Sequence, residues 1–395
     1  MTVNKERIRN LDFLRGIVIF MAVFEHYTGY LNYWYKDFFI REHDSWATLY
    51  ASHMPMVNRL LPMDGITANM CLWLVPWVSQ IYLALAMFNL ASKTQLQVKE
   101  KLKKHLFLYT SIIAVLYIEG FVIAPNFGEA LSFYPVMLWM VILALSSVIY
   151  SYCGIKGMLA MTVMSFFVSQ IGVPEALSAV EATVRQHVHP NFELDARVDL
   201  FLTSGCLGFV IGLVWHHMPQ LRDILCKGVM MWSALALFIF FTLGDLGHVS
   251  KFDVYEQEHS LAESTVGHLG IWGAEFLVIS VLLLLHLKKI EISWKPINWI
   301  GMYSLTVFIF HKSIFIFFWG PIMTLVTAKM GVHLVNNFMI VFLLSSLSIL
   351  FIYAFKRSGI LFHLMGTHQD ESWSHLYRDK TEADNTIGVK RDKAI

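Results

Sequence analysis

RNLDFLRGIVIFMAVFEH, residues 9–26, begins an apolar run that carries four ionisable side chains, Asp12, Arg15, Glu25 and His26. Each residue of an α-helix turns by about 100°, so Arg15 and His26, eleven residues apart, point in nearly the same direction. Asp12 joins them on that face. The helical rise separates Arg15 from His26 by about 16 Å, so we expect one near a membrane surface and the other deep inside. Because ionisable groups are costly in lipid, this face predicts a functional site.

The composition indicates a membrane protein. Of 395 residues, 56% are hydrophobic and 15% are charged, which predicts an all-α, polytopic membrane protein. The net charge of +1 argues against a nucleic-acid partner. Asp12 and Arg15 interrupt the first apolar run and no small-residue cleavage site follows it, so we expect the first helix to stay as an anchor. The four cysteines have no CxxC pair and no regular spacing, so no metal is expected.

Ten apolar runs are long enough to cross a bilayer. They cover residues 12–34, 68–92, 103–124, 131–150, 157–173, 198–216, 228–244, 267–286, 297–318 and 334–355. Lys and Arg gather at the N-terminus, in every second connection and at the start of the tail, as expected of cytoplasmic segments. The pattern predicts about ten transmembrane helices with both termini cytoplasmic. We expect residues 1–365 to form one transmembrane domain and residues 366–395 a flexible cytosolic tail.

Counting along each predicted helix assigns its ionisable residues to two layers. The outer layer contains His26, Glu275 and His311, with Glu25 and Lys312 beside them, and suits proton transfer. The inner layer suits the binding of phosphates from the cytosol. Its members are Asp12, Arg15, Lys103, Lys104, His105, His286, Lys288 and Lys289. A long, thin donor molecule could span both layers, and acetyl-CoA, with its phosphorylated head and terminal thioester, has that shape.

Every candidate also has a structural interpretation. Lysines at helix ends are commonly topology determinants. Arg15 and Asp12, at i, i+3 spacing, can form an ion pair that only stabilises the helix. Glu275 can pin two helices together as a neutral or paired carboxyl group. His311 can be a packed core histidine. For His26 we favour the functional interpretation, because it shares a face with Arg15.

The first helix resembles a known family. Leu11-Asp12-Phe13-Leu14-Arg15-Gly16, followed by His26, is similar to the signature of the acyltransferase-3 group of integral-membrane acyltransferases. The run Asp64-Gly65-Ile66-Thr67 leading to Val75-Pro76-Trp77-Val78 resembles the heparan-alpha-glucosaminide N-acetyltransferase branch. Gly301, Ser304 and His311 resemble a late helix of the same superfamily. Two features depart from the family: Lys101 and Lys104 stand where many members carry an arginine pair, and residues 80–86 lack a Ser-Gly element.

The resemblance implies an acyl-CoA-dependent acyltransferase that moves an acetyl or other short acyl group from cytosolic acyl-CoA to a hydroxyl or amine of a glycan or glycolipid on the outer or luminal side. Acetyl-CoA is then a co-substrate, and membrane lipids surround a monomer or a homo-oligomer. The expected location is a bacterial inner membrane, with a eukaryotic organelle membrane as the alternative.

The predicted mechanism assigns roles residue by residue. His26 is the general base, or alternatively carries the acyl group transiently, and Glu25 or Glu275 orients it. His311 binds the acceptor or supports His26. Arg15, positioned by Asp12, binds the donor phosphates together with Lys101 and Lys104. A proton-coupled transporter or flippase that uses Glu275, His26 and His311 as a relay is the competing hypothesis.

Overall fold

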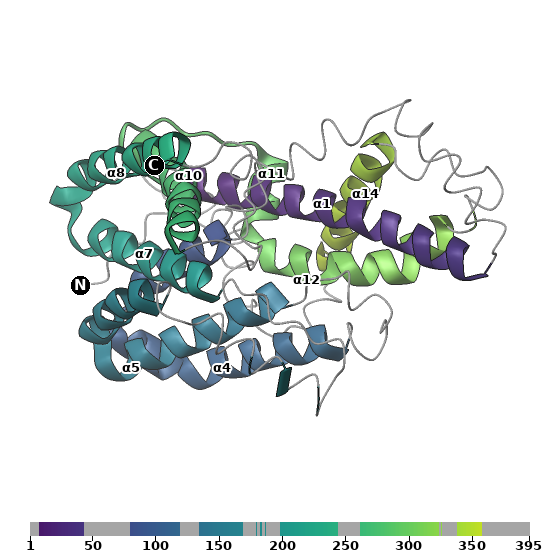
Figure 1. Ribbon diagram of the computed structural model, residues 1–395, viewed down its shortest axis with the longest axis horizontal. Coiled ribbons are helices and arrows are strands. Elements are labelled where there is room, and N and C mark those ends of the chain that lie inside the picture. Colours follow the sequence, from purple (N-terminus) through teal and green to yellow (C-terminus); the bar gives the residue numbers. More distant parts are fainter. Residues whose placement is uncertain are drawn as a thin grey trace, which may run out of the picture. The chain divides into compact units, whose positions relative to one another are not determined.

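The computed structural model describes residues 8–42, 80–118, 134–168, 198–243, 261–323 and 338–357 with a few single positions, and every regular element among them is helical. In chain order (Figure 1) these are α1 (Arg9–Glu42), the helix Gln80–Ala91, α4 (Gln95–Tyr117), α5 (Tyr134–Val168), α7 (Val198–His217), η3 (Pro219–Leu221), α8 (Arg222–Leu243), α10 (Leu261–Leu287), α11 (Lys295–Met302), α12 (Ser304–Ile314), η4 (Phe315–Trp319) and α14 (Phe338–Arg357). The chain divides into two units, residues 1–345 and 346–395.

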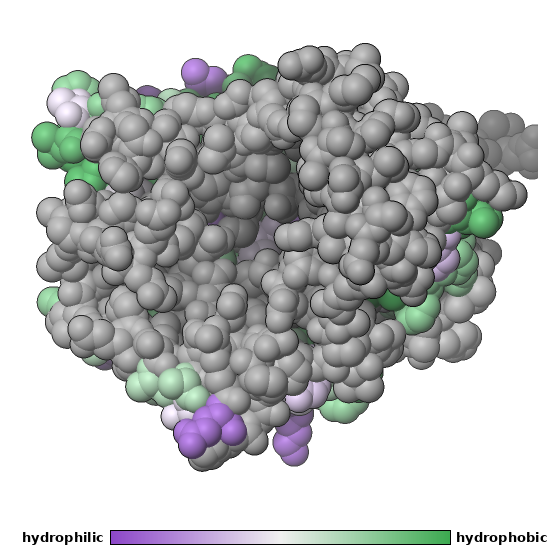
Figure 2. All heavy atoms as spheres, turned by 45° about the vertical axis from the view of Figure 1, so that its right-hand side comes forward, coloured by the Kyte–Doolittle hydropathy of each residue, from purple (hydrophilic) through white to green (hydrophobic). Residues whose placement is uncertain are grey.

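Four of the described helical segments are, by length and composition, long and apolar enough to cross a membrane: Val136–Phe167, which includes a reversal at Gly154, Pro219–Leu243, Val266–Leu287 and Ser304–Met323. α8 shows how such a helix differs from one in a soluble protein. It buries Cys226 and Phe240 on one face, while Met231 and Phe238 on another are 74% and 66% exposed. Figure 2 shows such exposed hydrophobic side chains, in green, on the described parts of the surface. A helix that is apolar all round and unburied on one side fits lipid contact.

α5 is two helices joined by a tight turn. Gly154 has φ 62° and ψ −152°, a conformation that favours glycine. Ser146 Oγ lies 3.9 Å from Met161 Sδ, although fifteen residues of continuous helix would separate them by about 22 Å. The chain therefore reverses at Gly154. Two antiparallel helices here agree with the separate apolar runs predicted at residues 131–150 and 157–173.

Close helix crossings depend on glycine. A Cβ atom on Gly16 of α1 would clash with the carbonyl oxygen of Ile297 in α11, and one on Gly301 would clash with that of Asp12. α7 contacts the helix Gln80–Ala91 in the same way, because Cβ atoms on Gly208 and Gly212 would collide with its backbone. Small residues that let two backbones approach are typical of helix contacts in membranes.

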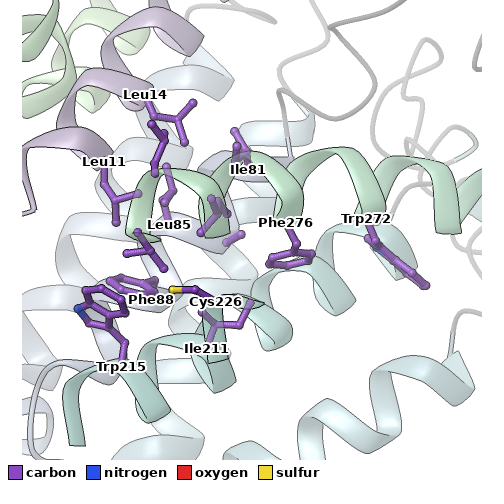
Figure 3. Packing of buried hydrophobic residues seen from close by; sticks show 14 of the residues in the cluster. Leu11, Leu14, Ile81, Leu85, Phe88, Ile211, Trp215, Cys226, Trp272 and Phe276 are labelled. Atoms are coloured by element: carbon purple, nitrogen blue, oxygen red, sulfur yellow. The ribbon is translucent and has the colours of Figure 1, made fainter. Parts of the chain in front are cut away.

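A buried apolar core joins α1, the helix Gln80–Ala91, α7, α8 and α10. Figure 3 shows side chains from these helices pointing toward one another, with Leu14 of α1 and Leu85 of the second helix above, and Trp215 of α7 and Phe276 of α10 below. Arg15 follows Leu14 directly in α1. The core therefore fixes the position of the helix face that carries the candidate site.

Asn10 fastens the start of α1 to the end of α10. Its side-chain Nδ2 donates to the carbonyl oxygens of Leu282 (3.2 Å) and Ile290 (3.0 Å), and its Oδ1 accepts from the Ile292 N–H (2.8 Å). Asn10 is fully buried, so these bonds satisfy both polar groups of its amide. α10 ends near this contact at Leu287, and Lys289 in the turn that follows has a φ of 60°.

The apolar run at residues 297–318 was expected to be a single helix, and the structure corrects this. Tyr303, with φ −110° and ψ 22°, separates α11 from α12, and the π-helical turn η4 follows α12. α11 meets the backbone of α1 at Gly301, and α12, after the break, also contacts α1. The motifs at residues 64–67 and 75–78 and the predicted domain boundary at residue 365 lie outside the described residues.

Candidate functional site

Arg15 lies near the start of α1 and makes two polar contacts there. Its Nη1 donates to Asp12 Oδ1 at 3.3 Å, as the i, i+3 spacing predicts. Its Nη2 donates to the Leu85 carbonyl oxygen of the neighbouring helix at 3.4 Å. The side chains of Arg15 and Asp12 are 16% and 10% exposed, so the guanidinium lies in a mostly buried but reachable position. The ion pair fits both the donor-binding and the purely structural interpretation.

His26 and His311 form a hydrogen-bonded pair between α1 and α12. His26 Nδ1 lies 2.9 Å from His311 Nε2, and the two rings stack with their centroids 5.1 Å apart. Tyr27 Oη donates to the His311 carbonyl oxygen at 2.7 Å and its ring lies against Phe315. Phe308 contacts both imidazoles edge-on or tilted. The structure thus brings together two histidines that are 285 residues apart in sequence.

The two histidines differ in their access to a ligand. His311 is completely buried, whereas His26 is only partly buried. A hydrogen bond between two imidazoles needs one donor nitrogen and one acceptor nitrogen, so it sets the tautomer of each neutral ring. When His26 Nδ1 is the donor, the lone pair of His26 is on Nε2. His26 then is the reachable ring with a basic nitrogen, and His311 is its buried support.

Arg15 and His26 are on one uninterrupted helix, since α1 runs from Arg9 to Glu42. Their separation of eleven residues corresponds to about 16 Å and nearly whole turns. The structure therefore retains the geometry on which the sequence interpretation depends. One α1 face carries a guanidinium at one level and an imidazole at another.

Glu275 contacts a residue that the sequence interpretation did not name. It is fully buried in α10, where Ser204 Oγ of α7 donates to its Oε2 at 3.2 Å. Among the described residues its Oε1 has no hydrogen-bond partner. The carboxyl group thus belongs to the contact between α7 and α10, and its predicted part in orienting His26 stays a prediction.

The remaining candidates are placed less centrally. Lys101 and Lys104 are both exposed on α4, a helix that contacts α5. The structure does not join them to Arg15 by any hydrogen bond or ion pair that it gives within the described residues. The side chain of Glu25 lies outside the described residues. For all three residues the predicted roles remain predictions.

Sequence reasoning missed Tyr27 and Asn10. Tyr27 directly follows His26, but nothing in the apolar pattern distinguishes a tyrosine that binds the His311 carbonyl from an ordinary core aromatic. The role of Asn10 could have been predicted, because a primary amide at the start of an apolar helix needs hydrogen-bond partners if it is buried. The GxxxG spacing of Gly208 and Gly212 likewise could have predicted a close helix crossing.

The sequence matches no protein-family model, and a search of curated proteins finds no match. The resemblance to the acyltransferase-3 group therefore depends on the short sequence motifs quoted above and stays a prediction. Two of those motifs, the first in α1 and the one that ends in His311, are in contact with each other.

Proposed function

We propose that this protein is an integral-membrane acyltransferase that moves an acetyl or similar short acyl group from cytosolic acyl-CoA to a hydroxyl or amine of a glycan or glycolipid across the membrane. The proposal includes ten spanning helices with both termini in the cytoplasm. The observation that carries it is the His26–His311 pair, placed on the same α1 face as the Arg15–Asp12 ion pair.

The spacing of Arg15 and His26 suits acyl transfer because it separates binding of the donor phosphates from the reaction at the thioester. A guanidinium forms strong, bidentate contacts with phosphates, and Arg15 would bind the head of the donor with Asp12 positioning it. The pantetheine arm of acetyl-CoA is extended, so its thioester reaches a second point well away from the phosphates. A base at about 16 Å, the separation of Arg15 and His26 along α1, is in the range that such an arm covers.

At the second point, His26 accepts the proton of the acceptor hydroxyl or amine on Nε2. The acceptor atom attacks the thioester carbonyl carbon, and the tetrahedral intermediate collapses as the carbon–sulfur bond breaks. His26 then returns the proton to the departing thiolate. His311, through its hydrogen bond to Nδ1, fixes the tautomer and the orientation that this requires.

Exchange of His26 for alanine tests the proposal. We expect His26→Ala to lower transfer of labelled acetyl from acetyl-CoA to acceptor by at least about 100-fold, because general-base catalysis contributes that much or more. Equilibrium binding of acetyl-CoA and thermal stability in detergent should stay near those of the wild type. Normal turnover in this variant would show that His26 is not the base.

A matched control is the exchange of a histidine from outside the site. His217 on α7 is exposed and contacts the Ala91 carbonyl oxygen. His217→Ala should therefore transfer acetyl at the wild-type rate.

Glu275 favours the second candidate, a proton-coupled transporter or flippase. A fully buried carboxyl group with one oxygen that lacks a partner among the described residues is typical of a group that exchanges protons. The two candidates differ in their need for a donor. Incorporation of label from acetyl-CoA into acceptor by purified protein in vesicles supports the acyltransferase, whereas a transporter incorporates none.

A further inference from the structure

Lys312 is a buried cation beside the histidine pair that the mechanism above does not use. It follows His311 in α12 and is only 4% exposed. Its neighbour in the chain, His311, lies 2.9 Å from His26, measured from Nε2 to Nδ1, where α12 contacts α1. These three side chains therefore form one cluster, contributed by α1 and α12.

The position of Lys312 in its helix makes this burial costly. Ser304–Met323 is one of the helices able to cross a membrane, and Lys312 lies eight residues from its start and eleven from its end. Those distances correspond to about 12 Å and 16 Å, too far for a lysine to extend its ammonium group to an interface. α12 also buries residues on nearly all sides, including Thr306, Val307, Phe308, Ile309 and Ile314. An ionisable side chain at such a position in an apolar helix points to a functional role.

We propose that Lys312 stabilises the oxyanion of the tetrahedral intermediate that forms beside His26. This inference rests on the proposed acyltransferase function. When the acceptor oxygen or nitrogen bonds to the thioester carbon, the carbonyl electron pair moves to its oxygen, which becomes negative, while the acceptor proton moves to His26. The oxyanion then lies within a few bonds of the base, next to the ammonium of Lys312. When the carbon–sulfur bond breaks, the negative charge leaves with the thiolate and is neutralised by the proton from His26.

A fixed charge in an environment that excludes water stabilises such an anion far more than the same charge in solution. Since the ammonium is already in place before the reaction, no reorganisation is needed when the charge develops. The ground-state thioester is neutral at its carbonyl, so Lys312 acts chiefly on the transition state. Its loss is therefore expected to lower kcat and to leave donor binding largely unchanged.

The experiment compares Lys312→Met, Lys312→Arg and the wild type as purified full-length protein in vesicles, with labelled acetyl-CoA as donor and glucosamine, which offers hydroxyls and an amine, as acceptor. We expect kcat to fall about 100- to 1,000-fold in Lys312→Met, the loss typical of one oxyanion-stabilising group. Binding of acetyl-CoA should change less than about threefold, and Lys312→Arg, which keeps the charge, should recover part of the rate. Lys227→Met, at an exposed lysine of α8, is the control and should be fully active.

The outcomes separate the two proposals. If the wild type transfers no acetyl group, the proposed function fails and the role of Lys312 fails with it. If the wild type transfers acetyl and Lys312→Met matches its kcat, only the role of Lys312 is overturned. If Lys312 had only a structural role, Lys312→Met would lower thermal stability and donor binding but preserve kcat. That result would also overturn the oxyanion-stabilising role of Lys312. Should Lys312→Met not fold, Lys312→Gln, which is polar but uncharged, replaces it, and a wild-type kcat in that variant has the same meaning.

Discussion

At the scale of single residues, Arg15 is the side chain whose two interpretations can be separated most directly. Its guanidinium contacts Asp12 and the Leu85 carbonyl oxygen, and these contacts would serve equally well in a structural ion pair or in a phosphate site. We expect Arg15→Ala to weaken acetyl-CoA binding by about tenfold or more, because charge-assisted hydrogen bonds to phosphate contribute about 1.5–3 kcal/mol. Titration of the purified protein with labelled acetyl-CoA measures this affinity.

Arg9 supplies the matched control for Arg15. It lies two turns earlier in α1 and pairs with Glu291 at 3.1 Å, with both side chains well exposed. Exposed ion pairs contribute little, so Arg9→Ala should bind acetyl-CoA as the wild type does. An unchanged affinity in Arg15→Ala, accompanied by a loss of thermal stability, would favour the structural ion pair.

The sequence alone predicts the relative positions of site residues only when those residues belong to one helix. Helical periodicity was enough to put Asp12, Arg15 and His26 on one face, because all three belong to α1. The contact between His26 and His311 depends on how α12 lies against α1, and no local pattern encodes that. Glu275 illustrates the limit: depth counting assigns it to the layer of His26, but a depth does not fix which neighbouring helix a side chain meets, and it bonds to Ser204.

At the scale of elements, the α1–α11 crossing brings together two of the three motifs that carry the family resemblance. Gly301 lies against the backbone of α1 at Asp12 and Gly16, where no Cβ atom fits. Gly301→Ala should therefore push the helices apart and lower the free energy of unfolding by about 1–3 kcal/mol, as overpacking does. Acetyl transfer should fall as well, because the crossing positions the Arg15 face. Thermal unfolding in detergent and the transfer assay measure the two effects.

Gly228 in α8 provides the comparison for Gly301. It also lies near one end of its helix, but a Cβ atom there would meet no other atom within 4 Å. Gly228→Ala should leave activity unchanged and raise stability by about 0.5–1 kcal/mol, since alanine favours a helix over glycine. If Gly301→Ala and Gly228→Ala had the same free energy of unfolding, the α1–α11 contact would be less tightly packed than described.

Element boundaries show what a hydropathy pattern can and cannot predict. The turn at Gly154 was predictable, because Gly154 and Lys156 interrupt the apolar sequence between two runs. The break at Tyr303 was not, since residues 297–318 contain no proline or charge between Ile297 and Phe310 that would stop a helix. The break follows Gly301, where α11 meets the backbone of α1, so it coincides with a tertiary contact that a hydropathy pattern does not contain.

At the scale of the whole molecule, the proposed function predicts that the Arg15 end of α1 faces the cytoplasm, where it would receive the donor. Composition alone predicts a membrane protein, and four described helices have the length and apolar character to cross one. The predicted ten-span topology with cytoplasmic termini depends on the distribution of Lys and Arg, which orients a protein during membrane insertion. A chemical probe of sidedness is therefore needed.

Cys153 is a natural probe of that topology. It is exposed and directly precedes the α5 turn at Gly154, whereas Cys206 and Cys226 are buried. The predicted topology puts this turn, with Lys156, on the cytoplasmic side. In a Cys71→Ser background, we expect a membrane-impermeant maleimide to label Cys153 in inside-out vesicles and not in intact cells. Cys153→Ser should lose the label in both. Labelling from outside intact cells would reverse the orientation of this hairpin, and since the Arg15 end of α1 is predicted on the same side as the turn, the donor could then no longer be cytosolic acyl-CoA.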